Sequence, residues 1–202
     1  MIREMRADDL PSVVALHRKC LTNSVLARFG ERFLHVLYRS YLESGVSVNL
    51  VVEDEGMVKA FISVTTDLDG QSAYTFERYA WRLARALLPA ILRRPWLVYR
   101  AVESFRYRKK AGLPGVEAEM LFIAVEPELR KRGVATDLIG EALRRMAARG
   151  VREVKVSTDR DNAPVNALLA RLGFAVRREF TFHGKRMNLH TARLTPRGEV
   201  IR

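Results

Sequence analysis

Residues 125–136 read Val125-Glu126-Pro127-Glu128-Leu129-Arg130-Lys131-Arg132-Gly133-Val134-Ala135-Thr136. A β-type run from Glu119 to Val125 precedes them, and an amphipathic helical pattern follows almost without a spacer. A strand, a basic loop and a helix in this order direct free backbone N–H groups and the positive end of a helix at one place. Such a place binds phosphate, so the sequence predicts a phosphorylated ligand at this turn.

The residues of this loop suit that ligand. Gly133 allows the backbone to approach a ligand closely, and the small Ala135 allows the helix to pack tightly. Arg130, Lys131 and Arg132 add positive charge for a phosphate. Taken alone, the pattern is weak evidence, because a solvated basic loop before a helix has the same sequence features, and both interpretations stay open.

Hydrophobic periodicity on both sides of this turn predicts alternating strands and helices. The expected elements are strands at 2–5, 46–53, 57–65, 116–125, 154–158, 174–182 and 186–194, helices at 10–21, 25–43, 135–149 and 162–171, and a basic helical segment at 71–115 broken by Pro89 and Pro95. The central strand–helix–strand order predicts a parallel pair, and the hairpins add antiparallel strands. We therefore expect an α/β (α+β) fold with a mixed, twisted sheet of about seven strands flanked by helices.

Composition limits the class of protein. The 202 residues fit one domain, 1–202, with residues 71–115 as a helical insertion between the third and fourth strands. The single cysteine, Cys20, lies in an apolar helical pattern, which favours a small core residue and excludes an internal disulfide. Residues 1–4 lack the apolar core of a signal peptide, so a cytoplasmic protein is expected. The net charge of +12 favours acidic partners.

A second motif runs from Asn162 to Gly173-Phe174. Asn162 is suited to cap a helix or to direct its amide at a ligand. Gly173 ends the helix, and Phe174 returns an aromatic ring to the core. By itself, this motif also has a purely structural interpretation as a cap and a core residue.

In this order and at this separation, the two motifs resemble those of the GNAT superfamily of N-acetyltransferases, which use acetyl coenzyme A. The superfamily's central motif is a strand ending in valine, then Arg/Gln-x-x-Gly-x-Gly/Ala and a helix, matched here by Val125 and by Arg130 to Ala135. Its next motif is an asparagine opening a helix that ends in Gly-Phe, matched by Asn162 through Phe174. The resemblance covers most of the chain, except for residues 71–115.

The resemblance implies a set of cofactor-binding residues. The backbone of Arg130, Lys131, Arg132, Gly133, Val134, Ala135 and Thr136 is expected to bind the coenzyme A pyrophosphate. The strand end at Ala124 and Val125 is expected to bind pantetheine and to donate an N–H to the thioester carbonyl, and Asn162 is expected to contact the pantetheine arm. The central parallel strands of this family part, and the acyl group lies between them.

The resemblance also implies direct attack of a primary amine on acetyl coenzyme A, which needs a base. Glu119, six residues before Val125, occupies the place of a catalytic glutamate in some family members. Its expected strand face holds Glu117, Leu121, Ile123 and Val125, so a buried carboxylate there needs compensation or a raised pKa. A strand-end ion pair with an arginine of 71–115 is the structural alternative, and Glu117 is a second candidate base.

Two positions depart from the family pattern. Many members carry a tyrosine, which protonates the leaving thiolate, seven residues after the asparagine, where this chain has Leu169. Some carry a glutamate five residues before that asparagine, where this chain has Ser157. Leu169 is the main argument for the alternative of a non-catalytic protein that binds coenzyme A. His183 is expected to be exposed at a hairpin tip, whereas His190 is a weaker candidate for the acceptor site.

The segment 74–110 carries ten basic and two acidic residues together with Trp81 and Trp96. Three interpretations stay open: a lid whose arginines bind a phosphorylated acceptor, an amphipathic surface that contacts an anionic membrane, and a structural or homodimer-forming subdomain. The chain has a weak similarity to acetyltransferases thought to act on amino sugars in bacterial surface-polysaccharide pathways. This similarity predicts a nucleotide- or lipid-linked amino sugar as the acceptor, with polyamine or protein amines as alternatives. That similarity rests on Gly30-x-x-Phe33-Leu34 and on the hairpin around His183.

Nucleic-acid binding is not favoured, because no base-stacking aromatic set or groove-reading helix stands out. No His, Cys or carboxylate set has the spacing of metal ligands, so no metal is expected.

Overall fold

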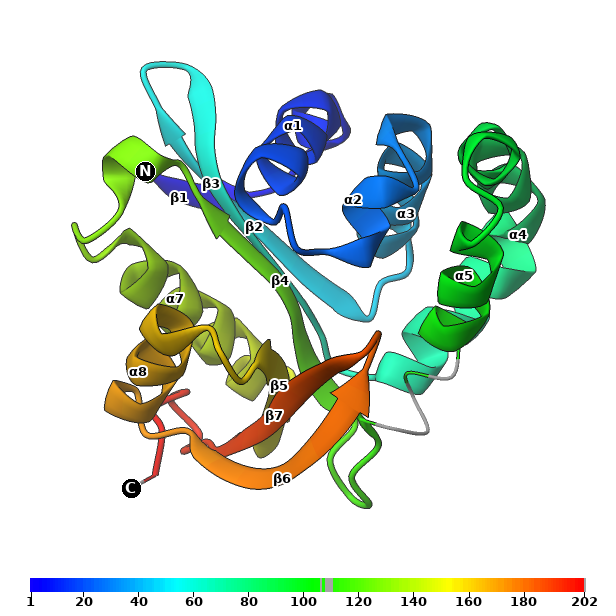
Figure 1. Ribbon diagram of the computed structural model, residues 1–202. Coiled ribbons are helices and arrows are strands. Elements are labelled where there is room, and N and C mark those ends of the chain that lie inside the picture. The colour runs from blue at the N-terminus through cyan, green and yellow to red at the C-terminus, as the bar shows by residue number, and fades with distance from the viewer. Residues whose placement is uncertain (106, 108–110, 202) are drawn as a thin grey trace.

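The computed structural model describes residues 1–105, 107 and 111–201 (Figure 1). Its strands are β1 (Ile2–Glu4), β2 (Ser47–Asp54), β3 (Met57–Thr65), β4 (Ala118–Val125), β5 (Glu153–Asp159), β6 (Ala175–Phe182) and β7 (Lys185–Arg193). Its helices are α1 (Leu10–Cys20), α2 (Val25–Arg28), α3 (Glu31–Glu43), α4 (Leu68–Arg93), α5 (Leu97–Phe105), α7 (Val134–Ala148) and α8 (Ala163–Arg171). The seven strands form one sheet in the order β1-β2-β3-β4-β5-β7-β6, which confirms the expected mixed sheet.

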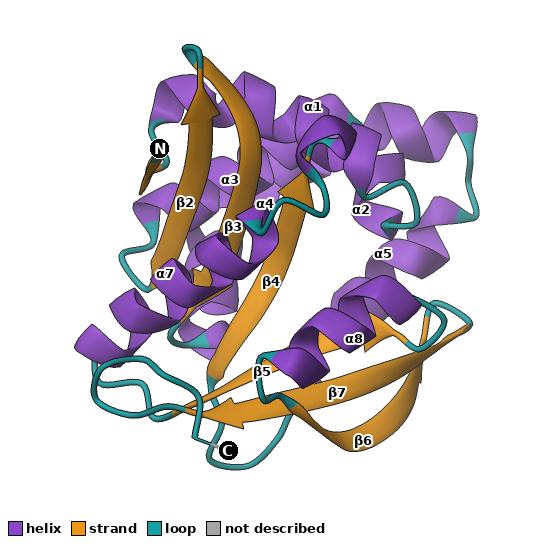
Figure 2. Ribbon diagram, turned by 90° about the vertical axis from the view of Figure 1, so that its left-hand side faces the viewer, coloured by secondary structure: helices purple, strands orange, loops and turns teal. Residues whose placement is uncertain are grey.

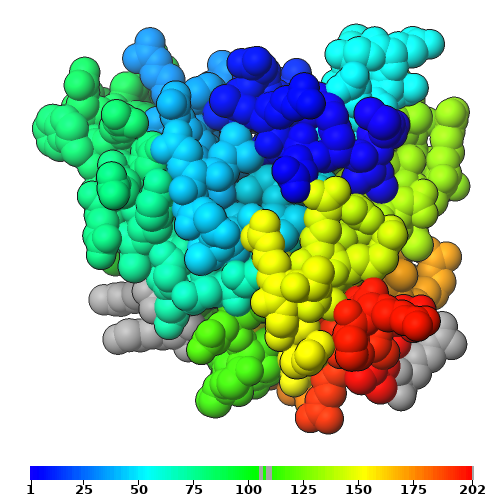
Figure 3. Space-filling view, turned by 180° about the vertical axis from the view of Figure 1, so that it is seen from behind, coloured from blue at the N-terminus to red at the C-terminus, as the bar shows by residue number. Residues whose placement is uncertain are grey.

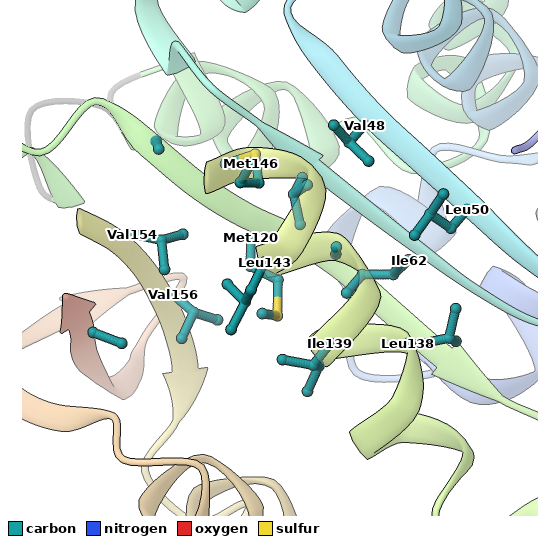
Figure 4. Packing of buried hydrophobic residues seen from close by; sticks show 14 of the residues in the cluster. Val48, Leu50, Ile62, Met120, Leu138, Ile139, Leu143, Met146, Val154 and Val156 are labelled. Atoms are coloured by element: carbon teal, nitrogen blue, oxygen red, sulfur yellow. The ribbon is translucent and has the colours of Figure 1, made fainter. Parts of the chain in front are cut away.

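The helices cover both faces of this sheet (Figures 1 and 2). Helices α7 and α8 pack on one face, where Met120, Leu143 and Met146 belong to a continuous apolar cluster (Figure 4). Helices α1 and α3 cover the other face, with Tyr38 and Phe61 fully buried between them and the sheet. Helix α4 packs beside α3, so the insertion extends the molecule on that second face.

Among the strands of the described residues, β4 and β5 form the only parallel pair, and it is short. It joins Ala118 to Val154, Glu119 to Lys155 and Met120 to Val156, and no further pair follows. Beyond Met120, β4 stays paired with β3, whereas β5 stays paired with β7. The two strands therefore part at the middle of β4, as the family resemblance implies (Figure 2).

A β-bulge alters which side chains of β4 share a face. The register with β3 shifts between Ser63 and Val64, where Leu121 is the additional residue. Glu119 was expected to share a face with Ile123 and Val125, and this prediction is wrong. Ile123 and Val125 pack toward α7, whereas Ala124 packs toward α1 and α3. One extra residue exchanges the faces of everything that follows it.

Two expected helices differ from the structure. The helix predicted at 25–43 is divided into α2 and α3 at Gly30, whose φ of +97° lies outside the helical region. Pro89 does not break α4, which begins earlier than expected, at Leu68, and continues to Arg93. Pro89 is exposed, so water can reach the carbonyl that loses its partner. Pro95, by contrast, separates α4 from α5, as predicted.

Candidate active site

The turn after β4 exposes backbone amides at the start of α7. A short 3₁₀ turn, Pro127–Leu129, leads into the basic loop. Lys131 has φ of +61° and Gly133 has φ of +84°, and left-handed residues of this kind bring successive N–H groups to one side. The first helical hydrogen bond of α7 runs from Asp137 N–H to Gly133 O at 3.0 Å. The backbone N–H groups that precede Asp137 therefore lie outside the helical hydrogen-bond pattern. This geometry suits a phosphate.

The end of β4 presents backbone groups to the place where β4 and β5 part. Glu126 N–H donates to Lys59 O at 2.9 Å, in register with the ladder of β3 and β4. Antiparallel pairs alternate, so Ala124 bonds to β3, whereas Ile123 and Val125 direct their N–H and C=O away from it. Val125 O accepts from Arg130 Nε at 3.1 Å. Ile123 is thus a candidate that the sequence analysis missed, and the backbone of Ala124 is engaged elsewhere.

Glu119 lies on the first half of β4, where this strand still pairs with β5. Its side chain is buried, with 1% of the residue exposed. Oε1 accepts a hydrogen bond from the Tyr107 hydroxyl. Oε2 lies 3.9 Å from Lys155 Nζ and has no hydrogen-bond partner within the described part of the chain. One oxygen of the carboxylate is therefore held, and the other is unused.

This environment sets the proton affinity of Glu119. Burial raises the pKa of Glu119 to about 7, and the Tyr107 hydrogen bond and the positive charge of Lys155 both act in the opposite direction. Lys155 is itself buried, and its Nζ donates to Val116 O at 2.9 Å. A carboxyl group with a pKa near neutrality is suited to accept a proton under physiological conditions.

Sequence reasoning did not find Tyr107 or Lys155. Tyr107 belongs to the insertion, which has no counterpart in the family motif, and its ring lies 5.0 Å from that of Phe182 in β6. Lys155 alternates with Val154 and Val156, and such a residue usually faces solvent. Here both faces of the sheet are covered, so Lys155 lies buried on the Glu119 face, and the hydroxyl of the half-buried Ser157 is buried there too.

The other ionisable candidates lie apart from this centre. Glu117 precedes β4 and is exposed, unlike Glu119. His190 pairs with Val156, so it lies on the opposite face from Glu119, where its Nε2 is 3.0 Å from both Thr158 Oγ1 and Asn166 Oδ1. His190, the weaker candidate for the acceptor site, is therefore not beside Glu119.

The prediction that His183 is exposed is also wrong. Its side chain is only 7% exposed, because Glu103 of α5 binds both its backbone and its ring. The Nδ1 of His183 lies 2.9 Å from Glu103 Oε2, and its Nε2 lies 3.1 Å from Ser104 Oγ. These contacts join the insertion to the turn between β6 and β7.

The second motif has the local structure that was predicted for it. Asn162 is exposed and caps α8, with its Oδ1 accepting from Val165 N–H at 3.4 Å. Leu169 is 1% exposed and packs in the core under α8, so it supplies no acid. Cys20, at the end of α1, is half-buried beside the apolar cluster of α1 and α3 on the other face of the sheet, and it donates from Sγ to Val125 O at 3.5 Å.

Comparison with known proteins identifies the fold and the family. A family model described as "Acetyltransferase (GNAT) family" matches residues 11–174. The chain belongs to the GNAT acetyltransferase family.

Solved structures show the same fold over nearly the whole chain. A phosphinothricin acetyltransferase of Sinorhizobium meliloti, in complex with AcCoA, is 18% identical, with 96% of this chain and 88% of that chain covered and a TM-score of 0.63. A ribosomal-protein-alanine N-acetyltransferase of Brucella melitensis is 17% identical, with 96% and 99% covered and a TM-score of 0.63. At these identities the likeness concerns the fold alone.

Among curated proteins, a mycothiol acetyltransferase of Clavibacter michiganensis subsp. michiganensis is 38% identical over 60 residues. The match includes 30% of this chain and 20% of that protein, so the chain spans one fifth of the relative's length.

The turn before α7 leaves room for a phosphate-bearing ligand. A Cβ built at Gly133 would meet only Asp137 Oδ2, at 4.0 Å, so the turn has open space beside its amides.

Within the described residues, no three His, Cys, Asp or Glu side chains gather where they could hold a metal ion. Among the same residues, no helix has the length and apolar character needed to cross a membrane.

Proposed function

We propose that this GNAT enzyme transfers acetyl from acetyl-CoA to a primary amine of a small, anionic acceptor, with Glu119 as the general base. The observation that carries the proposal is a buried carboxylate with one unpartnered oxygen, located where β4 and β5 part. In the reaction, a carbon–nitrogen bond forms as the carbon–sulfur bond of the thioester breaks. The acceptor nitrogen loses a proton, and Glu119 Oε2 takes it, directly or through one water.

The division of work between the two oxygens of Glu119 supports this role. Tyr107 fixes Oε1, which orients the carboxylate, whereas Oε2 is free to accept a proton. Lys155, at 3.9 Å, favours the ionised form without a hydrogen bond that would have to break. The nearby buried Ser157 hydroxyl is a further polar group on this face. Protonation of the leaving thiolate is assigned to water, because Leu169 carries no acid.

The proposed cofactor site comprises the turn and the end of β4. The backbone from Arg130 to Thr136 binds pyrophosphate at the start of α7. Val125, together with Ile123, offers backbone groups to the pantetheine arm and to the thioester carbonyl. Asn162, exposed at the start of α8, contacts the same arm. The charged side chains of Lys131 and Arg132 are exposed at the mouth of this site.

The insertion supports an anionic acceptor. It supplies Tyr107 to Glu119, and its helix α5 binds the turn between β6 and β7 through Glu103 and His183. It therefore forms one wall of the region around the base. Because arginines are abundant in this segment, an acceptor that carries phosphate, such as a nucleotide- or lipid-linked amino sugar, is electrostatically favoured.

The test is a turnover screen that measures free thiol released from acetyl-CoA. The acceptors are UDP- and dTDP-amino sugars, the same amino sugars without phosphate, polyamines and peptides with free N-termini. Glu119→Gln, which keeps the shape of the side chain, is assayed in parallel with Glu117→Gln as its matched control. Release with the phosphorylated amino sugars, lost only in Glu119→Gln, is the expected result.

The opposite results separate the parts of the proposal. Release with polyamines or peptides alone would overturn the acceptor class and leave the base in place. Equal release by the wild type and Glu119→Gln would overturn the base. Acetyl-CoA binding without release for any acceptor in the panel would overturn a nucleotide-linked acceptor and favour a lipid-linked acceptor or a non-catalytic protein.

A further inference from the structure

Helix α4 exposes a row of large apolar side chains. Trp81 is 73% exposed, Leu88 is 53% exposed and Leu92 is 72% exposed. At 3.6 residues per turn, these three positions fall within about 20° of one direction around the helix axis. Most exposed apolar residues are scattered singly, so a row of three on one helix is a feature that needs an explanation.

The row points away from the body of the protein. Leu83, Leu87 and Ala90, which pack against the apolar cluster under α3, lie about 180° to 240° from Trp81 around the same helix. Both the ribbon and the space-filling views show α4 along one lateral edge of the molecule (Figures 1 and 3). The inner face of α4 thus accounts for its packing, and the outer row is left for an external partner.

Arginines adjoin the row on one side. Arg85, Arg78, Arg82 and Arg93 fall between about 40° and 120° from Trp81, and all four are exposed. On the other side lies one acidic residue, Glu77. Helix α4 therefore presents an apolar strip with a cationic border, and Trp96 and Tyr99 add exposed aromatic rings just beyond its end.

This combination of side chains matches an anionic lipid surface. Leu and Trp side chains enter the boundary between headgroups and acyl chains, while adjacent arginines bind the headgroup phosphates. Nucleic acid would use the arginines but would leave Leu88 and Leu92 in water. A second copy of the chain would bring like charges together, because each copy carries a net charge of +12.

We propose that the outer surface of α4, defined by Trp81, Leu88 and Leu92 with Arg78 and Arg85, docks this enzyme on an anionic membrane. The helix lies along the bilayer surface and does not cross it. The insertion that carries this surface also supplies Tyr107 to Glu119, so docking would hold the proposed base near acceptors that are attached to lipid.

The test measures binding to vesicles of equal parts phosphatidylglycerol and phosphatidylcholine, with pure phosphatidylcholine vesicles for comparison. We expect binding to the anionic vesicles only, weakened by added salt, and a blue shift of tryptophan emission that is lost in Trp81→Leu. Arg78→Glu/Arg85→Glu should weaken binding by at least about 25-fold, at roughly fivefold for each arginine. Leu88→Ser/Leu92→Ser should also weaken binding to the anionic vesicles, because serine side chains do not enter the boundary between headgroups and acyl chains.

The matched controls are Arg197→Glu and Met57→Ala, which change an exposed arginine and an exposed apolar residue outside the insertion. Both should bind as the wild type does. Equal binding to the two vesicle types, an equal loss in the controls, or no binding at all would overturn the proposal. Self-association abolished by Leu88→Ser/Leu92→Ser, without vesicle binding, would assign the surface to a second copy. Because no readout depends on acetyl transfer, failure here would leave the proposed reaction intact.

Discussion

The two ends of β4 carry different kinds of chemistry. At its start, the proposed base Glu119 has a buried side chain whose proton affinity is set by burial, Tyr107 and Lys155. After its end, the proposed pyrophosphate site is a turn of exposed residues that depends on the left-handed φ of Gly133. The proposed base and the proposed anion site therefore lie at opposite ends of one strand.

The two ends of β4 should therefore differ in which substitutions they tolerate. A backbone site depends on conformation, so many sequences can form it provided that Gly133 keeps its left-handed φ. A buried ionisable side chain depends on every group around it, including groups from distant segments. Substitutions at the start of β4 should therefore alter rate and pH dependence, whereas substitutions at its end should alter affinity for acetyl-CoA.

The largest expected effect is that of Glu119→Gln. The maximal rate, kcat, should fall about 10²- to 10⁴-fold, because the amide cannot accept the proton. The KM for acetyl-CoA should stay close to the wild-type value, since the turn is unchanged. Steady-state thiol release with the best acceptor measures both. A normal rate in Glu119→Gln, or a matching loss in the exposed Glu117→Gln, would remove the contrast between the two ends.

Gly133→Val should give the opposite pattern. A β-branched residue at a φ of +84° costs about 1–2 kcal/mol, and its side chain would enter the open space beside the amides. Acetyl-CoA affinity should fall about tenfold or more, as measured by titration calorimetry, and folding should be checked by thermal unfolding. Gly140→Ala, in the middle of α7 with nothing near its Cβ position, is the matched control and should bind normally. Unchanged affinity in Gly133→Val would contradict the assignment of the turn.

A smaller effect concerns the acid side of the pH profile. Because the pKa of Glu119 is raised to about 7, kcat/KM should fall as pH decreases through neutrality. Tyr107→Phe removes a hydrogen bond that lowers this pKa, so the acidic limb should move to higher pH and the rate at neutral pH should fall several-fold. Tyr99→Phe, an exposed tyrosine of the insertion, should leave the limb in place. A limb that moves to lower pH would contradict the role of Tyr107.

The smallest effect is on stability. Glu119 has a higher pKa in the folded protein, about 7, than its usual value of 4.5, so the folded state binds more protons between these pH values. Its contribution to the free energy of unfolding is therefore greatest below pH 4.5 and is lost as pH rises through about 7. Relative to Glu119→Gln, the wild type should lose stability across this interval, as denaturant titrations at several pH values would measure. An opposite slope would mean that the carboxylate is well compensated.

The local sequence predicts the conformation of the turn before α7, but it does not predict the surroundings of Glu119. Gly133, the basic loop and the helix after it lie within one short stretch, and local geometry follows from local sequence there. Glu119 was identified as a candidate, but its neighbours come from residue 107 and from β5, which no local pattern connects to it. The bulge at Leu121 arises from pairing with β3, so the expected strand face after it was wrong.

The short pairing of β4 with β5 also has a mechanical meaning. Strands β1–β4 and strands β5–β7 are joined across three residue pairs, so a small rotation about that line breaks few backbone hydrogen bonds. A change in the distance between the parted strands should then cost less energy than most other deformations of the sheet. Such a change would allow acyl groups of different length to fit. Glu119 and Lys155 face each other across this line. Protonation of the Glu119 carboxylate would therefore weaken an electrostatic attraction between strands β1–β4 and strands β5–β7.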